Sequence, residues 1–271
     1  MSKGNLEYLS AKSINFAIAD INFSMSFEYP ARIDWFWKNY RSFISYNHHK
    51  EKVFIVVKAI QKDNEDLTVA DRHFSLNLKY GTVFKIRGNF SNGQFIVEAR
   101  KGVDLSGLIR VLTSAVLIEK GGFLLHACGV AQDNRGYVFC GPSESGKTTI
   151  ASLAGKRPVF SDETVALRKN GNCWYVYSTP FFGNLGKQEI NGNIPLHTLF
   201  FIHKSPVFSH QRLSQPQALK RLLPNINFID MHQNRVNKLL DMASEITNSV
   251  SCYDLYFKPQ NSIWRYIHGI S

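Results

Sequence analysis

The sequence has few cysteines and no long apolar run, and each absence excludes a class of protein. Four cysteines in 271 residues, with no C-x-x-C pair among them, give neither a disulfide framework nor a structural zinc pattern. The most apolar stretch, 105–130, is interrupted by two charged residues and two glycines at 119–122. No uninterrupted run therefore reaches the roughly 18 residues of a membrane span, and we expect no membrane partner.

The sequence also lacks an apolar segment near its start, where MSKGNLEYLS is polar. A secretion signal would carry a short apolar run there. Together with the sparse cysteines, this predicts a cytoplasmic protein with reduced thiols.

Clustered charge is missing as well, although the net charge is +11. Up to Val103 there are 15 basic and 10 acidic residues, and beyond it 17 and 11, so the excess is spread evenly. No block of five like charges and no interleaved aromatic and basic motif occurs, and we expect no DNA or RNA partner. A solvated basic surface explains the charge, and an anionic partner or substrate is the alternative.

The first hundred residues read mainly as strands, which predicts a smaller β-rich N-terminal domain over 1–103. Apolar residues alternate from Ile14 to Ile18 and again from Ile21 to Phe27, with a bulge or turn between them. One helix is expected, with Ile33, Trp37, Tyr40 and Ile44 on one face. The other expected features are strands at 53–60, 74–80, 83–87 and 94–99 and a hairpin turn at Asn92-Gly93.

From residue 104 the pattern changes to alternating strands and helices, which predicts an α/β domain over 104–271. Asp104 is a candidate N-cap for a helix that Gly121 and Gly122 end, and Ser214 with Gln217 three residues on opens another. Asn170-Gly171 indicates a hairpin. The expected strands are 123–130, 136–140, 158–161, 164–168, 173–177, 199–202 and 250–257, with further helices at 147–154 and 236–246.

The strongest functional signal is the segment from Gly141 to Thr149, GPSESGKTT, which matches G-x-x-x-x-G-K-[ST] between an expected strand and an expected helix. In such a loop, backbone N–H groups surround nucleotide phosphates, a lysine contacts the β- and γ-phosphates and a hydroxyl binds magnesium. We therefore expect ATP and Mg²⁺ as cofactors, with Lys147 and Thr148 in those last two roles. The expected nucleotide-binding residues are Gly141, Ser143, Glu144, Ser145, Gly146, Lys147, Thr148 and Thr149.

Glu144 places a carboxylate within this loop, where it would repel phosphates unless it faces solvent or a cation. Solvent exposure is the simpler interpretation, because a charge is most stable when it is hydrated. Contact with a metal or with a substrate group is the alternative.

A second signal is the acidic pair Asp162 and Glu163, which ends a short apolar strand 15 residues past Lys147. Phosphoryl transfer needs a carboxylate near Mg²⁺ and often one that accepts the proton of the attacking hydroxyl. Neighbouring residues on a regular strand face opposite ways, so both acids can serve one site only if the strand ends or bends there.

Three segments together resemble one family: LLHACGV at 124–130, GPSESGKTT at 141–149 and FSDE at 160–163 look like the catalytic domain of HPr kinase/phosphorylase and its shorter relatives. The resemblance spans roughly 104–267. It implies a P-loop kinase domain with a mixed sheet of the phosphoenolpyruvate-carboxykinase type. It also implies that His126 is a site residue, that Asp162 is the base and that Glu163 is the acid on the metal side.

The sequence departs from that family at two places. Glu163 stands where the bifunctional enzymes carry a second aspartate, which keeps the charge and lengthens the side chain. The glycine-rich ExRGxG-type segment is absent, and the corresponding stretch, 178–183, is closer to that of the small related kinases. These departures argue against HPr itself as the acceptor.

Two histidines and one cysteine have competing interpretations. His126 would share a strand face with Leu124 and Cys128, so a buried structural histidine rivals its catalytic role. For His203 a structural role is favoured over a place in the cleft, since an isolated histidine has no defined geometry in sequence. Cys140 is interpreted as a small packing residue rather than a nucleophile.

The resulting hypothesis is an ATP- and Mg²⁺-dependent kinase with Asp162, Lys147 and His126 as catalytic residues and Thr148, Glu163 and Asp162 at the metal. The γ-phosphoryl group would pass to a hydroxyl, with a serine of a protein or peptide as the expected acceptor. The alternatives are a nucleotide-binding regulatory protein without transfer and a small-molecule kinase. A decarboxylating carboxykinase is disfavoured because the chain is short. Association into a homo-oligomer stays open.

Overall fold

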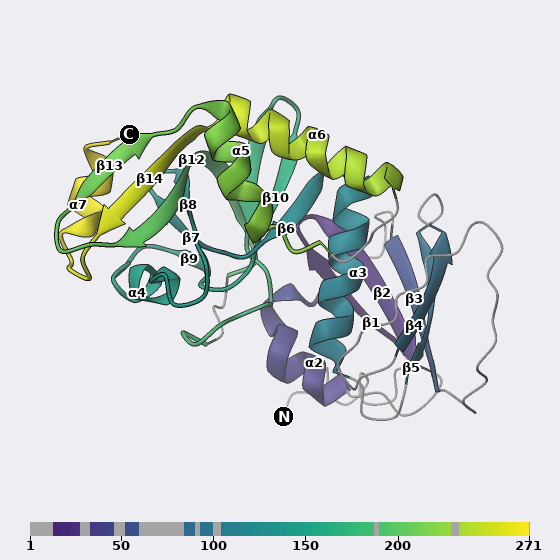
Figure 1. Ribbon diagram of the computed structural model, residues 1–271. Coiled ribbons are helices and arrows are strands. Elements are labelled where there is room, and N and C mark those ends of the chain that lie inside the picture. Colours follow the sequence, from purple (N-terminus) through teal and green to yellow (C-terminus); the bar gives the residue numbers. More distant parts are fainter. Residues whose placement is uncertain are drawn as a thin grey trace. The chain divides into compact units, whose positions relative to one another are not determined.

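The computed structural model describes residues 13–27, 33–45, 52–59, 84–89, 93–99, 104–186, 190–228 and 233–270. The chain divides into two compact units, Met1–Leu112 and Thr113–Ser271. The division falls within α3 (Leu105–Glu119), whereas the sequence places the boundary just before that helix. Each unit contains one sheet, so the structure is mixed α/β (Figure 1).

The first unit is built on a sheet of strand order β1-β2-β3-β5-β4. Its inner strands β2, β3 and β5 are parallel, and β1 and β4 add antiparallel at the two edges. The turn expected between the first two strands is confirmed as a two-residue hairpin, because Ala19 and Asp20 both have positive φ, 51° and 59°. The bounds are β1 Ser13–Ile18, β2 Ile21–Phe27, β3 Lys52–Ala59, β4 Phe84–Asn89 and β5 Gln94–Ala99.

The helix expected from residue 33 is shorter than the sequence predicts. Helix α2 spans Ile33–Tyr40, a 3-10 turn follows at Arg41–Phe43, and Ile44 is extended and bridges to Phe16. The prediction that Ile44 shares a helix face with Trp37 and Tyr40 is therefore wrong. Of the described side chains of α2, Trp37 is partly buried, whereas Phe36 and Tyr40 are buried. Both rings pack against Phe16, at 5.6 and 6.0 Å between centroids. The expected strand 74–80 and Asn92 of the expected turn lie outside the described residues.

Helix α3 begins where the sequence predicts. The carboxylate of Asp104 accepts hydrogen bonds from the backbone N–H groups of Ser106 and Gly107, at 3.0 and 3.1 Å, so Asp104 is the N-cap. The helix ends at Glu119, and Gly121 follows with φ 78°, a conformation that glycine adopts readily.

The second unit is built on a mixed sheet in which β12 is central. Its strand order is β6-β10-β11-β12-β8-β7-β9, and β14 pairs with β12 and carries β13. Strand β12 is parallel to β8 and to β14, so these three strands end at one edge of the sheet. The bounds are β6 Gly122–Leu125, β7 Ala127–Gln132, β8 Arg135–Cys140, β9 Val159–Ser161, β10 Val165–Asn170, β11 Cys173–Tyr177, β12 Asn193–Lys204, β13 Ser209–Arg212 and β14 Ser251–Phe257.

The single strand expected at 123–130 is wrong, because the structure breaks it at His126. Strand β6 pairs with β10, whereas β7 pairs with β8 and β9. The chain therefore changes partners at His126, a bend residue that is partly exposed between buried neighbours. A hairpin not expected from the sequence joins β7 to β8 through Asp133 and Asn134, both at positive φ. The hairpin expected at Asn170-Gly171 is confirmed, with Asn170 paired to Cys173.

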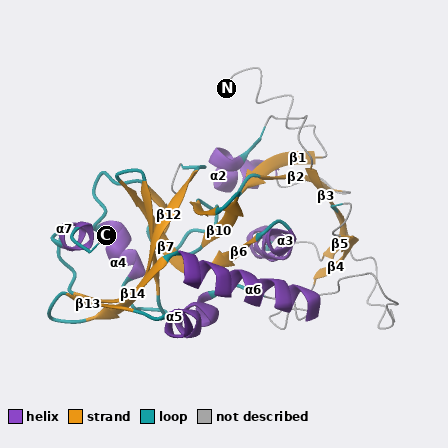
Figure 2. Ribbon diagram, turned by 90° about the horizontal axis from the view of Figure 1, so that it is seen from above, coloured by secondary structure: helices purple, strands orange, loops and turns teal. Residues whose placement is uncertain are grey.

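Helices cover both faces of this sheet (Figures 1 and 2). On one face, Leu199 and Phe201 pack with α5 and α6; on the other, Phe200 and Ile202 pack with α4 and α7. The ring of Phe139 stacks on Phe200 at 5.4 Å and meets Trp264 edge-on at 5.7 Å. Each fully buried side chain of this kind contributes about 1.5–3 kcal/mol, so both layers anchor the strands. The bounds are α4 Lys147–Ser152, α5 Gln215–Leu222, α6 Gln233–Ser249 and α7 Ile263–His268.

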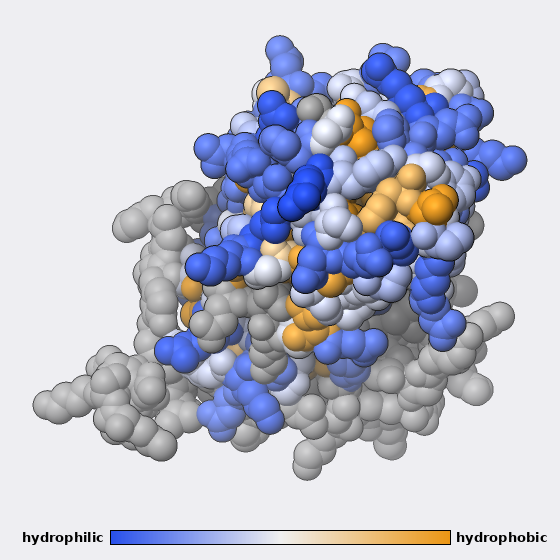
Figure 3. All heavy atoms as spheres, turned by 90° about the vertical axis from the view of Figure 1, so that its left-hand side faces the viewer, coloured by the Kyte–Doolittle hydropathy of each residue, from blue (hydrophilic) through white to orange (hydrophobic). Residues whose placement is uncertain are grey.

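The surface of the second unit is mainly hydrophilic on the face that carries β13 and α7, where hydrophobic side chains form separate small areas (Figure 3). The large hydrophobic residues that are exposed in this unit, among the described residues, are Val207, Leu223 and Leu240. None of the helices that the structure describes is both long and apolar enough to cross a lipid bilayer.

Candidate functional site

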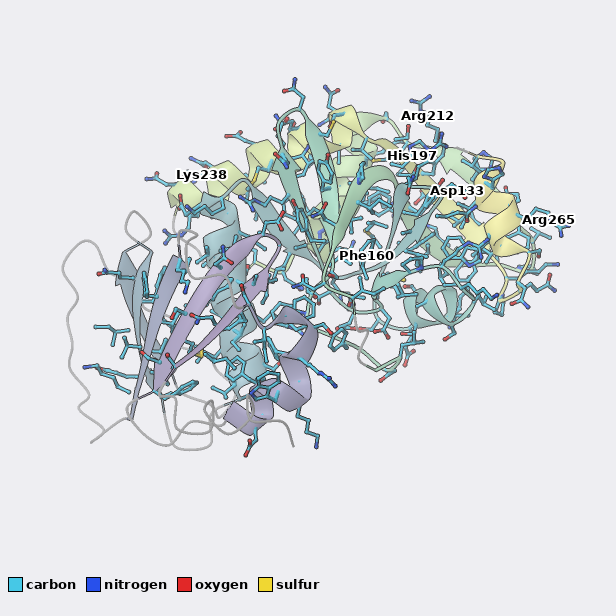
Figure 4. The ribbon with its side chains drawn as sticks, turned by 180° about the vertical axis from the view of Figure 1, so that it is seen from behind. Asp133, Phe160, His197, Arg212, Lys238 and Arg265 are labelled. Carbon is cyan, nitrogen blue, oxygen red and sulfur yellow. The ribbon has the colours of Figure 1, made fainter. Side chains whose placement is uncertain are left out.

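The glycine-rich loop lies where the parallel strands end. It leaves β8 at Cys140 and enters α4 at Lys147, and β12 and β14 end beside it. In open α/β sheets, ligands bind at the carboxyl ends of parallel strands, near the point where the strand order reverses. Figure 4 labels Phe160 near this end of the sheet and Asp133 in the turn at the other end of β7.

The loop backbone has the alternating handedness of an anion-binding nest. Glu144 has φ 66° and Gly146 has φ 112°, with Ser145 between them outside the positive-φ region, and this alternation is the backbone pattern of such a nest. Two glycines leave no room for a side chain: a Cβ on Gly141 would lie 2.6 Å from Ser145 Oγ, and one on Gly146 would lie 2.6 Å from Phe257 Cζ. The Glu144 side chain is exposed, which agrees with the solvent-facing interpretation.

Lys147 is folded onto this loop. Its Nζ donates hydrogen bonds to the carbonyl oxygens of Gly141 at 2.7 Å and Pro142 at 2.9 Å, and its side chain is buried. Burial lowers the pKa of Lys147, and the Glu163 carboxylate is the largest of the charges that oppose this effect. Glu163 therefore acts electrostatically on the loop lysine.

Ser145 supplies an unpaired polar group inside the loop. Its hydroxyl is buried and has no hydrogen-bond partner within the part of the chain that the structure describes. A buried hydroxyl without a partner costs about 1–3 kcal/mol, so a ligand that provided a partner would stabilise the loop. The site thus fits an anion with several acceptor oxygens.

Asp162 lies next to α4, the helix that follows the loop. Its carboxylate accepts hydrogen bonds from Thr148 Oγ1 at 3.3 Å and from the backbone N–H groups of Gly183 at 2.9 Å and Leu185 at 3.0 Å. The residue is 1% exposed. A buried carboxylate is stable only with such partners, so the segment around Gly183 fixes its position.

Glu163 points to a different neighbour. Strand β9 ends at Ser161, and the chain bends at the next two residues, which confirms the condition under which both acids can serve one site. Glu163 Oε1 lies 3.3 Å from His126 Nδ1, and the two side chains are 35% and 25% exposed. The backbone N–H of Ala127 donates to the carbonyl of Glu163, which holds the pair together.

The segment 178–186 is part of the site, although no site residue was predicted in it. The hydroxyl of Ser161 donates a hydrogen bond to the backbone carbonyl of Phe181. The hydroxyl of Thr179 donates one to the backbone carbonyl of Thr164. A Cβ on Gly183 would lie 2.8 Å from Asp162 Oδ2, so only glycine brings its N–H this close. The signal that could have located this segment is the Gly183 and Gly186 pair just beyond a strand.

A pocket of about 540 Å³ opens beside the loop. Its volume lies in the range of small-molecule sites, and its walls combine apolar and polar side chains. The phosphate loop and the carboxyl ends of β12 and β14 both contribute to it. The lining residues are Gly146, Thr149, Lys204, Ser205, Pro206, Phe257 and Pro259.

The residues that the sequence assigned to a metal do not form a closed ligand cage. Within the described ranges, no three His, Cys, Asp or Glu side chains gather as metal ligands. Magnesium needs no such cage, because it keeps several waters and binds one or two protein oxygens together with phosphate oxygens. The Thr148 hydroxyl is an oxygen of that kind, and Asp162 accepts its proton and orients it, so the residues fit the ion.

The remaining candidates have structural contacts. His203 Nε2 lies 2.8 Å from Asp254 Oδ1, and the imidazole stacks on Tyr256. It follows Leu199 and Phe201 on the sheet face that packs against α5, away from α4. Cys140 is buried, and burial raises the pKa of its thiol well above the usual range, which agrees with a packing role.

Comparisons with known proteins do not assign this chain to a family, so the functional assignment rests on the geometry of the site. No family model matches the chain, and no curated protein matches it. Among solved structures, the Hpr(Ser) kinase/phosphatase from Coxiella burnetii matches 54% of this chain and 92% of that chain, at 10% sequence identity and a TM-score of 0.30. A similarity of this size does not decide the fold or the activity.

Proposed function

We propose that this protein is an ATP- and Mg²⁺-dependent phosphotransferase whose second unit has a nucleotide fold of the phosphoenolpyruvate-carboxykinase type. The observation that carries the proposal is the loop from Gly141 to Thr149: a nest with a buried lysine and a buried unpaired hydroxyl, next to two acids and a pocket. The nest, the lysine and the hydroxyl fit phosphate oxygens, the acids fit the accompanying Mg²⁺, and the pocket has room for a nucleoside.

In this proposal the triphosphate lies in the loop and the nucleoside occupies the adjacent pocket. Lys147 leaves the carbonyl oxygens of Gly141 and Pro142 and turns its ammonium group to the β- and γ-phosphates. Thr148 would hold Mg²⁺ through its hydroxyl oxygen, with Asp162 accepting the proton of that hydroxyl, and the ion would offset the charge of the phosphate oxygens. Fixed positions and electrostatic stabilisation then account for most of the rate.

The acceptor is a hydroxyl, and a serine of a protein or peptide is the acceptor we propose. His126 and Glu163 are partly exposed beside the loop, so a group from outside can reach them. The hydroxyl oxygen attacks the γ-phosphorus, the bond to the β-phosphate oxygen breaks, and ADP leaves with that electron pair.

The test is transfer of labelled γ-phosphate from ATP, first to water and then to serine peptides, by wild type and Lys147→Ala. We expect Lys147→Ala to bind Mg·ATP about 10- to 100-fold more weakly, as loss of a contact to a charged group costs about 1.5–3 kcal/mol, and to lose transfer. Lys156→Ala removes an exposed lysine of the same region and is the matched control.

Two results would contradict the proposal. Unchanged ATP affinity in Lys147→Ala would remove the loop from nucleotide binding. Binding of Mg·ATP by the wild type without any transfer would instead favour a nucleotide-binding regulatory protein.

A further inference from the structure

We infer that the two acids divide their tasks in the order opposite to the one the family resemblance implies: Asp162 serves the metal side together with Thr148, and Glu163 with His126 receives the acceptor hydroxyl. The inference rests on the proposed phosphotransferase activity. It follows from where the two carboxylates lie and what they contact.

Both carboxylate oxygens of Asp162 already accept hydrogen bonds. One oxygen accepts the N–H of Gly183, and the other accepts the N–H of Leu185 and the hydroxyl of Thr148. With 1% of the residue exposed and no space above Gly183, an acceptor serine has no approach to this carboxylate. Its contact with Thr148 instead joins it to the hydroxyl that binds magnesium in loops of this type.

Glu163 is placed for the opposite task. Its side chain is about a third exposed, and it contacts His126, which is itself a quarter exposed. A group that receives a hydroxyl must lie within hydrogen-bond reach of it, and partial exposure permits that approach.

The local backbone explains why neighbouring acids diverge. Ser161, the last residue of β9, accepts hydrogen bonds at its Oγ from the N–H groups of Glu163 and Thr164. This turn ends the strand, so Asp162 faces the loop helix and Glu163 faces the bend at His126. The bend exists because β6 and β7 pair with different strands.

The transfer step is then as follows. The acceptor oxygen forms its bond to the γ-phosphorus while the bond between that phosphorus and the β-phosphate oxygen breaks. The electron pair of the broken bond stays on ADP, and the hydroxyl proton passes to the Glu163 carboxylate, which His126 holds in place. The proton leaves to solvent after the product departs.

The first experiment measures binding of a fluorescent ATP analogue, mant-ATP, with and without Mg²⁺. We expect Asp162→Asn and Thr148→Val to reduce the enhancement of affinity by Mg²⁺ about 10- to 100-fold, the usual cost of a lost metal ligand or its partner. Glu163→Gln and the exposed control Asp241→Asn should keep the full enhancement. Thr148→Val keeps the test decisive if Asp162→Asn does not fold.

The second experiment follows single-turnover release of labelled γ-phosphate from ATP to water, which needs no knowledge of the acceptor. We expect Glu163→Gln to slow release about 100-fold or more at saturating Mg·ATP, the range for loss of a general base. Asp241→Asn should retain the wild-type rate.

Two outcomes overturn the inference: wild-type release by Glu163→Gln, or full Mg²⁺ enhancement in both Asp162→Asn and Thr148→Val. A third outcome, in which the wild type neither binds Mg·mant-ATP nor releases phosphate, is distinguishable from these two. That result removes the proposed function itself, and the inference with it.

Discussion

At the scale of single residues, Gly146 combines two constraints at one Cα. Its φ of 112° lies in the region that L side chains rarely adopt, and a Cβ there would lie 2.6 Å from the ring of Phe257. Phe257 also lines the pocket beside the loop. The glycine thus lets the loop close against the wall of the proposed nucleotide pocket.

Gly146→Ala should lower both stability and nucleotide affinity. Backbone strain costs about 1–3 kcal/mol, and relief of the contact with Phe257 has to displace the loop or the ring. The matched control is Gly155→Ala, because Gly155 also has a positive φ, 63°, and nothing lies within 4 Å of its Cβ position.

Chemical denaturation and mant-ATP titration check both variants. Both should lose stability, and only Gly146→Ala should lose affinity. Equal affinity in the two variants would contradict the role given to the Gly146 contact.

At the scale of elements, helix α5 begins with the capping box that its sequence predicts. Both hydrogen bonds of the capping box form between Ser214 and Gln217, and Ala218 and Leu222 are buried beneath the helix. The sequence signature alone was sufficient here because every group involved lies within four residues.

Ser214→Ala should therefore cost about 1 kcal/mol of stability, the usual loss for removal of an N-cap hydroxyl. Thermal or urea unfolding measures it, with Ser209→Ala on the exposed strand β13 as the control. A loss equal to that of the control would show that the cap contributes nothing.

Long-range pairing explains the elements that the sequence did not predict. Apolar residues continue through His126, so nothing local marks the change of partner from β10 to β8. The segment 178–186 contacts Asp162 through the backbone N–H groups of Gly183 and Leu185, which every residue except proline carries. Such contacts leave little pattern in side-chain type, and the one local trace here is the glycine at 183.

At the scale of the whole molecule, the candidate site lies entirely in the second unit, Thr113–Ser271. The phosphate loop follows one parallel strand, and the pocket is completed by the ends of two others, which are more than 50 residues further along the chain. The sequence predicted the loop and the acids from local motifs. The division of tasks that we propose for Asp162 and Glu163 rests on tertiary contacts, which the local motifs do not contain.

The central claim is that the loop from Gly141 to Thr149 binds a nucleoside triphosphate, and the most direct measurement is the melting temperature with a non-hydrolysable Mg·ATP analogue. At 100 times the Kd, one-site binding adds about 2.7 kcal/mol. For a chain of this size that is a rise of roughly 5–10 °C, smaller in Lys147→Ala and unchanged in Lys156→Ala. A wild-type melting temperature that does not move at millimolar analogue would contradict the claim.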